Sequence, residues 1–210
     1  MKTKAVDSFL NCTLYRYGLD DETEDKEVTL VRHLDTEEGW RVGGLAWNSM
    51  DSRLVISTVE EHSDWCDHTA KILVYSVDRS SGDLRSEQPG LSLSTQSCLT
   101  VTSHSRHDSG LLAAGSYTGE VTIYRTDREA GAEAELMTSG TEGDTDTHNP
   151  VVAILWLSRN SLVSVHSSGV IRLFTLDTRK NLLILKKVII CLYSTFVNTK
   201  PLKTLGTIVS

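Results

Sequence analysis

The chain has 210 residues and a formal net charge of −7, with 39% hydrophobic and 23% charged residues. These proportions are typical of a globular protein, and the negative charge disfavours nucleic-acid binding, which needs clustered Lys and Arg. The most apolar stretch, residues 182–197, is interrupted by two lysines and is shorter than the roughly 18 to 20 clean residues of a membrane span, so we expect a soluble protein without membrane insertion.

Short strands separated by polar loops are predicted along most of the chain. An N-terminal segment, residues 1–27, is expected to be partly disordered apart from a strand at 11–17. Later strands are predicted at 28–34, 41–47, 54–59, 71–77, 91–94, 98–103, 111–127 (two strands), 134–138, 151–156, 162–166, 170–176 and 182–187. Residues 140–149 are expected to form a mobile acidic loop, and 188–210 a tail outside the repeat.

One outline of two strands and a tight turn recurs along the chain. Leu111–Asp127 (LLAAGSYTGEVTIYRTD) and Leu162–Asp177 (LVSVHSSGVIRLFTLD) share it, and Ala70–Asp78 (AKILVYSVD) preserves its second strand. The closing aspartates Asp78, Asp127 and Asp177 lie 49 and 50 residues apart. A period of this size, with several strands per unit, is typical of β-propeller blades. The sequence therefore predicts an all-β fold.

Three blades of four-stranded antiparallel sheet are predicted, at 28–90 with an insertion at 60–69, at 91–139 and at 150–187. Three blades cannot close a ring, and they leave apolar end faces uncovered, so we expect a partial, open propeller that needs further blades or a partner. The residues expected to define the repeat structurally are Trp47, Tyr75, Asp78, Gly119, Tyr124, Asp127, His148, Trp156, Gly169, Phe174 and Asp177.

The repeat resembles WD repeats in which another pair replaces the terminal Trp-Asp, such as Val77-Asp78 or Leu176-Asp177. GSYTGEVTIY (Gly115–Tyr124) and the blade start DTHNPVVAILWL (Asp146–Leu157) resemble the dynein intermediate chains more specifically, although the His-to-Pro spacing is one residue shorter than in that family. LAWNSMDSRLV, HSDWCDH and DRSSGDLRSEQP are similar to the type that serves cytoplasmic dynein 2, the motor of retrograde intraflagellar transport.

The resemblance implies a non-catalytic scaffold without cofactors, in which the propeller binds the dynein heavy chain. Other dynein 2 subunits, with light chains as further candidates, would be partners, and the location would be the cytoplasm and the cytoskeleton, at the cilium or its base. The family carries a long N-terminal segment and a full ring of blades, so we interpret this chain as a fragment or truncated product. The alternative is a generic WD-repeat adaptor in ubiquitin ligation or trafficking.

The insertion Glu60–Thr69 holds the densest set of candidate ligands: His62, Asp64, Cys66, Asp67 and His68. A zinc site usually needs four ligands in paired spacings, whereas Cys66 stands alone here, so a structured surface loop is favoured over a metal site. Within the loop, His62, Asp64 and Trp65 are the candidate partner-binding residues, because an exposed aromatic among charges is a common interface anchor. The four scattered cysteines of the chain favour reduced thiols.

Histidines at 104, 107, 148 and 166 could suggest acid–base chemistry, but structural or exposed roles are favoured. In WD repeats a histidine before the inner strand often bonds a turn aspartate. His148 has that position, although no aspartate stands in the turn at 167–169. The sequence contains no nucleophile elbow and no phosphate-binding loop, and the inner strands are too apolar to line a reactive channel, so we expect no enzymatic activity.

Overall fold

The computed structural model describes residues 2–8, 11–17, 28–35, 41–61, 66, 68–128, 135–139, 149–190 and 208–209; before residue 41, at 135–136 and at 208–209 it describes the backbone alone. In these ranges every regular element is a β-strand. No helix among them is long and apolar enough to cross a membrane.

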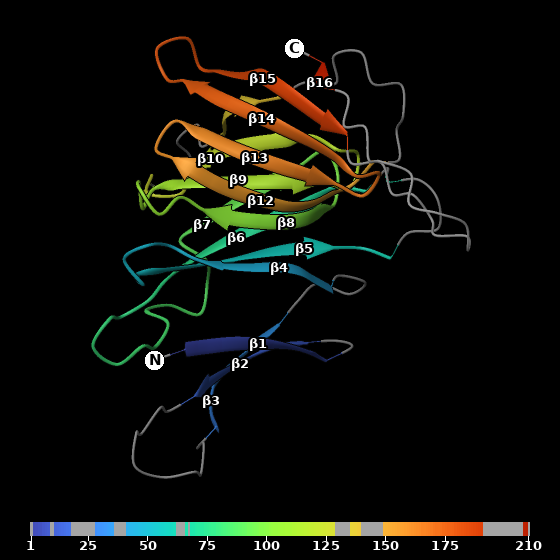
Figure 1. Cartoon of the computed structure of the whole chain (residues 1–210). Coiled ribbons are helices and arrows are strands. Elements are labelled where there is room, and N and C mark those ends of the chain that lie inside the picture. The colour runs from blue at the N-terminus through green and yellow to red at the C-terminus, as the bar shows by residue number, and fades with distance from the viewer. Residues whose placement is uncertain are drawn as a thin grey trace, which may run out of the picture. The chain divides into compact units, whose positions relative to one another are not determined.

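The strands form four antiparallel sheets (Figure 1). The first contains β1 (Lys2–Ser8), β2 (Asn11–Tyr17) and β3 (Val28–Asp35). The second contains β4 (Arg41–Trp47), β5 (Arg53–Val59), β6 (Ala70–Ser76) and β7 (Leu91–Thr95). The third contains β8 (Leu99–His104), β9 (Leu111–Ser116), β10 (Val121–Arg125) and β11 (Glu135–Thr138). The fourth contains β12 (Val151–Ser158), β13 (Ser161–His166), β14 (Val170–Asp177), β15 (Leu182–Ile190) and β16 (Ile208–Val209).

The last three sheets have the topology of propeller blades, in which successive strands pair as neighbours. We call them blades 1, 2 and 3, for β4–β7, β8–β11 and β12–β16. The chain divides into two compact units within β8, between Leu99 and Thr100. Blade 1 and the β1–β3 sheet belong to the first unit, and blades 2 and 3 to the second. The all-β architecture of antiparallel blades is the one that the repeat predicts.

Each unit has its own hydrophobic core. In the first unit, β5 and β6 supply the fully buried side chains, and Trp47 packs against them while partly exposed. In the second unit, blades 2 and 3 pack face to face around a shared core: Leu111, Ala113, Val121, Ile123, Met137, Val151, Ile154, Leu162, Phe174, Leu176 and Leu183. Both blades contribute to it because their inner strands are apolar on the faces that meet.

A close approach of backbone and side chain joins blades 2 and 3. A Cβ added to Gly115 on β9 would lie 2.5 Å from the Cβ of Val151 on β12, so only glycine allows this spacing. The indole Nε1 of Trp156 donates to the carbonyl of Ser103 at 3.0 Å, and the hydroxyl of Thr100 lies 2.5 Å from the carbonyl of Val151. Packing and hydrogen bonds thus hold the two blades together in one unit.

The repeated positions occupy equivalent places in the three blades. The aromatic residues Tyr75, Tyr124 and Phe174 are all at most 5% exposed. Gly119 and Gly169 close their turns at φ of 90° and 85°, a conformation that a side chain would disfavour. The closing aspartates differ: Asp78 and Asp177 accept hydrogen bonds from the backbone of the following turn, whereas Asp127 pairs with Arg125 at 2.9 Å.

Several bounds differ from those expected. Blade 1 ends at Thr95 rather than at residue 90, because β7 pairs with β6; the closing aspartate marks the end of the third strand and not of the blade. Segment 28–35 joins β1 and β2 in a separate sheet rather than blade 1, so strands replace part of the disorder expected at 1–27. In blade 3, β15 continues to Ile190 and pairs with β16, which lies in the segment expected as a tail.

Candidate functional site

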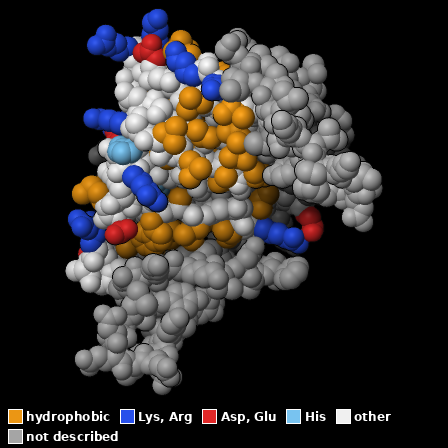
Figure 2. All heavy atoms as spheres, viewed as in Figure 1, with side chains coloured by type: hydrophobic (Ala, Val, Ile, Leu, Met, Phe, Trp, Pro, Cys, Tyr) orange, Lys and Arg blue, Asp and Glu red, His pale blue; other side chains and the backbone are white. Residues whose placement is uncertain are grey.

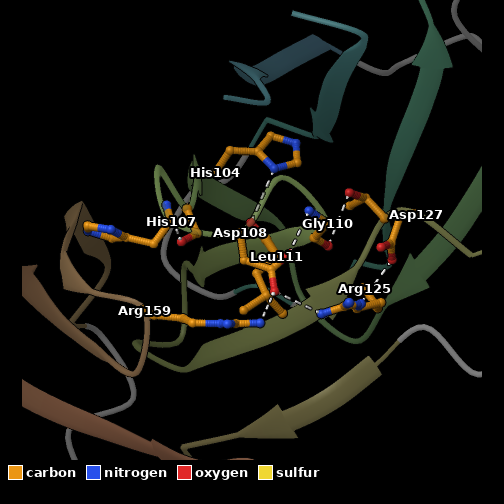
Figure 3. A network of polar contacts seen from close by, with 10 residues as sticks. His104, His107, Asp108, Gly110, Leu111, Arg125, Asp127 and Arg159 are labelled. Carbon is orange, nitrogen blue, oxygen red and sulfur yellow. Dashed lines mark hydrogen bonds and ion pairs between the residues drawn. The ribbon is translucent and has the colours of Figure 1, made fainter. Parts of the chain in front are cut away.

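A polar network lies at one end of the blade 2 and blade 3 strands, in the second unit (Figure 3). Its centre is Asp108, in the turn between β8 and β9, whose side chain is only 14% exposed. Arg125, at the end of β10, approaches its carboxylate at 3.3 Å, and Arg159, in the turn between β12 and β13, approaches it at 3.5 Å. Two guanidinium groups from two blades therefore converge on one carboxylate.

A backbone hydrogen bond also holds the carboxylate of Asp108. The amide of Gly110 donates to Asp108 Oδ1 at 3.0 Å, which orients the carboxylate toward the arginines. Arg125 also pairs with Asp127, so that its side chain is held between two carboxylates. Charge-assisted contacts with two guanidinium groups hold this partly buried carboxylate in a fixed orientation. The network thus presents its charged groups in a fixed arrangement at this end of the strands.

The network borders a hollow of about 700 Å³. Its lining is charged on the outside and apolar at the base: Asp108, Leu111, Arg125, Asp127, Arg128, Met137, Arg159, Asn160, Leu176, Thr178 and Asn181. We call this surface the rim hollow. Arginine is enriched at protein–protein interfaces because its planar head forms several directed hydrogen bonds. The rim hollow therefore offers a preformed surface for a polar partner.

A second cluster lies in the first unit, where two thiols and an imidazole meet. The ligand atoms of Cys66, His68 and Cys98 all lie within 4.8 Å of one another. Cys66 and His68 belong to the insertion between β5 and β6, whereas Cys98 directly precedes β8. Cys66 and Cys98 are not joined by a disulfide. The folding of blade 1 thus brings together residues 32 positions apart in the sequence.

Backbone donors point at both sulfur atoms of this cluster. The amide of Cys98 donates to Cys66 Sγ at 3.2 Å, and the amide of Glu60 donates to Cys98 Sγ at 3.3 Å. Burial raises the pKa of the Cys98 thiol to about 11, against the lowering effect of the Glu60 amide, and the neighbouring Cys66 raises it further. The Glu60 carboxylate lies 3.5 Å from Nε2 of His68.

The outward face of blade 3 exposes many large hydrophobic side chains (Figure 2). Strand pairing places Leu155, Val163 and Leu173 in one row across three strands, with their neighbours Leu162 and Phe174 pointing to the opposite, buried face. The exposed hydrophobic residues of β12 are Val152, Leu155 and Leu157, and those of β15 are Leu182, Leu185, Ile189 and Ile190. Of these, Leu185 and Ile190 pair with Phe174 and Val170, so they lie on the side of Phe174 and not on that of Leu155. Exposed apolar patches of this kind are typical of the interaction surfaces of proteins.

The buried histidines have structural hydrogen bonds. In His166, Nδ1 donates to the carbonyl of Asn149 at 3.1 Å, so Nε2 accepts from the hydroxyl of Ser164 at 2.9 Å. His104 donates from Nδ1 to the carbonyl of Leu111 at 3.2 Å. Asn149, next to the expected His148, caps the turn at 167–169 by accepting from the amide of Ser168.

The candidate partner-binding residues His62, Asp64 and Trp65, together with Asp67 and His148, lie outside the described residues. Sequence reasoning missed Cys98 as a companion of Cys66, because the two are far apart along the chain and neither forms a paired motif. It also missed the network around Asp108. The repeat does place Asp108 and Arg159 in the same turn of successive blades, between the first and second strands, and this correspondence is the sequence feature that could have indicated the network.

No family model matches the chain. Its sequence is 28% identical over 130 residues to cytoplasmic dynein 2 intermediate chain 2 of Mus musculus, covering 61% of this chain and 23% of the mouse protein. The chain is similar to a dynein intermediate chain. The human protein of the same name is 26% identical over 144 residues, covering 65% of this chain and 26% of the relative. The chain thus spans about a quarter of the length of the curated relatives it matches.

Solved structures confirm the fold. The chain superposes on Chaetomium thermophilum Sqt1 bound to the N-terminus of the ribosomal protein L10 with a TM-score of 0.55 and 18% identity, covering 82% of this chain and 43% of Sqt1. It superposes on the β-propeller domain of Myceliophteria thermophila Cps50 (Swd1) with a TM-score of 0.54 and 10% identity, covering 97% and 66%. The fold is a partial WD-repeat β-propeller, and the predicted resemblance to dynein 2 intermediate chains is confirmed.

Proposed function

We propose that the chain is a non-catalytic scaffold of the dynein 2 type, whose blades bind the dynein heavy chain for retrograde intraflagellar transport at the cilium. The similarity to cytoplasmic dynein 2 intermediate chain 2, which extends over about 60% of the chain, is the observation that carries this proposal. The fold is consistent with it but does not select it, because WD-repeat propellers serve many assemblies.

The rim hollow is the proposed contact with the heavy chain. In a propeller the faces of the blades are covered by neighbouring blades, and the ends of the strands with their turns remain open to a partner. The rim hollow lies at such an end, and it combines three arginines with two aspartates over an apolar base. We expect a partner segment there with acidic groups facing Arg159, whose side chain is 72% exposed.

A retention assay tests the proposal. The full chain would be passed over immobilised heavy-chain tail of cytoplasmic dynein 2, with the tail of cytoplasmic dynein 1 as the specificity control. We expect retention by the dynein 2 tail, and about tenfold weaker binding of Arg159→Glu because its charge is reversed at the rim hollow. Lys186→Glu makes the same charge change on β15, away from the hollow, and should bind like the unaltered chain.

Three outcomes are informative. If Arg159→Glu and Lys186→Glu are both retained as strongly as the unaltered chain, the scaffold function is supported, but the rim hollow is not the contact. Equal retention by the two tails would favour a general dynein scaffold over one of the dynein 2 type. Failure of the folded chain to bind either tail would reject the proposal and favour the generic WD-repeat adaptor.

A further inference from the structure

We propose that Cys66, His68 and Cys98 bind a zinc ion that clips the insertion between β5 and β6 to the segment leading into β8. The set contains two thiols and an imidazole, and their ligand atoms lie within 4.8 Å of one another. Thiolate and imidazole ligands are the combination that zinc prefers in proteins. The inference is independent of the proposed dynein function.

The spacing is close to that of a zinc site. For Zn–S bonds of about 2.3 Å and Zn–N bonds of about 2.0 to 2.1 Å, tetrahedral geometry places the ligand atoms about 3.5 to 3.8 Å apart. The ligand atoms here are up to 4.8 Å apart, so they would have to move about 1 Å closer together to bind one zinc ion. Cys66 and His68 stand in a loop at intermediate burial, so side-chain rotation can supply this movement. Cys98 is buried and provides the fixed ligand.

Backbone donors lie against both sulfurs of the cluster. Each sulfur accepts a hydrogen bond from a backbone amide, that of Cys98 for Cys66 and that of Glu60 for Cys98. The hydroxyl of Ser97 adds a longer contact of 3.5 Å to Cys66. Hydrogen-bond donors to the ligand sulfurs are a usual part of metal–thiolate sites.

Glu60 provides the outer carboxylate that metal-binding histidines usually have. Its Oε2 lies 3.5 Å from Nε2 of His68, so Nδ1 would be the ring atom that ligates the ion. The Nδ1 atom is buried. Among the described residues, three protein ligands would then hold the zinc, and the fourth position is open to water or a further donor. The thiols release their protons to solvent as the Zn–S bonds form.

The number and identity of the ligands are tested on the full chain, purified under reducing conditions without chelators. We expect one zinc per chain by elemental mass spectrometry, and binding that a chromogenic chelator competes for reversibly. Glu60→Gln removes a carboxylate that does not touch the ion, so it should weaken zinc binding by roughly 10- to 100-fold. Cys66→Ser and Cys98→Ser each remove a ligand atom and should weaken zinc binding by more than that. His107→Asn, which alters a histidine in the turn between β8 and β9, should bind zinc as the unaltered chain does.

A second measurement remains decisive if a ligand variant fails to fold. Cobalt(II) added to the unaltered chain should give the sulfur-to-metal charge-transfer absorption of two thiolates, and zinc should abolish it. Less than one zinc per five chains together with no cobalt spectrum would overturn the proposal.

Discussion

The two faces of blade 3 contain the same kinds of side chain, but leucines at the centres of these faces differ sharply in exposure. Leu162 on β13 is 0% exposed in the core shared with blade 2, whereas Leu155 on the neighbouring β12 is 60% exposed on the outward face. Strands that are apolar on both faces are expected where both faces become covered. The comparison teaches that blade 3 has the composition of an internal blade, with one face packed within this chain and the other offered to a neighbour.

The largest effect is expected from a matched pair of leucines on these two faces. Leu162→Ala should lower the free energy of unfolding by about 2 to 5 kcal/mol, because it leaves a cavity in the packed core. Leu155→Ala should change it by less than about 0.5 kcal/mol, because its side chain is already in water. Urea unfolding followed by circular dichroism measures both. Equal losses would show that the outward face is covered in solution, for instance by a second copy.

The packed face should also resist added volume. Gly115→Ala would place a methyl group 2.5 Å from the Cβ of Val151, so we expect a loss of about 1 to 3 kcal/mol in the free energy of unfolding. Gly90→Ala is the control, since the nearest atom to its added Cβ is 3.9 Å away. If both variants unfold at the same urea concentration, blades 2 and 3 are less tightly packed than the distance implies.

A polar contact between the same two blades should have a smaller effect. Trp156→Phe removes the indole N–H that donates to the carbonyl of Ser103 at 3.0 Å, and we expect a loss of about 1 kcal/mol in the free energy of unfolding. Slow exchange of this indole proton with deuterium, measured by NMR in the unaltered chain, tests the hydrogen bond directly. Rapid exchange would contradict it.

The sequence predicted the strands and the period of the blades well, because both depend on local alternation and on turns such as those at Gly119 and Gly169. It could not predict which face of blade 3 is covered, since apolar residues occupy both faces. It also could not pair Cys66 with Cys98 or bring Arg159 to Asp108, because these contacts depend on how blades and loops meet in space. Periodicity indicates the repeating unit, whereas side-chain clusters arise from tertiary structure.

At the rim hollow a still smaller effect on stability is expected. Arg159→Ala removes one partner of Asp108, but the arginine side chain is 72% exposed and Arg125 remains at 3.3 Å. Exposed ion pairs contribute little, so the free energy of unfolding should fall by less than about 0.5 kcal/mol. Thermal unfolding at low and high salt measures it. A large loss would show that the network holds blades 2 and 3 together rather than presenting a surface to a partner.

The smallest effect is expected at a polar group of blade 1, Asp78, whose side chain is 43% exposed. The side chain and the amide of Ser80 both donate to Asp78, and these hydrogen bonds lower the pKa of its carboxyl below the reference value of 3.8. Because the folded pKa is lowered, the contribution to stability is present above the unfolded pKa and is lost as the pH falls through the folded pKa. Carboxyl titration by NMR should give a midpoint below 3.8 in the folded chain and a higher one in urea.

Asp78→Asn should then unfold with nearly unchanged stability at neutral pH, since solvent screens an exposed charge. A clear loss in that variant would mean that the closing aspartate is a structural determinant of blade 1 comparable with its buried aromatic, Tyr75.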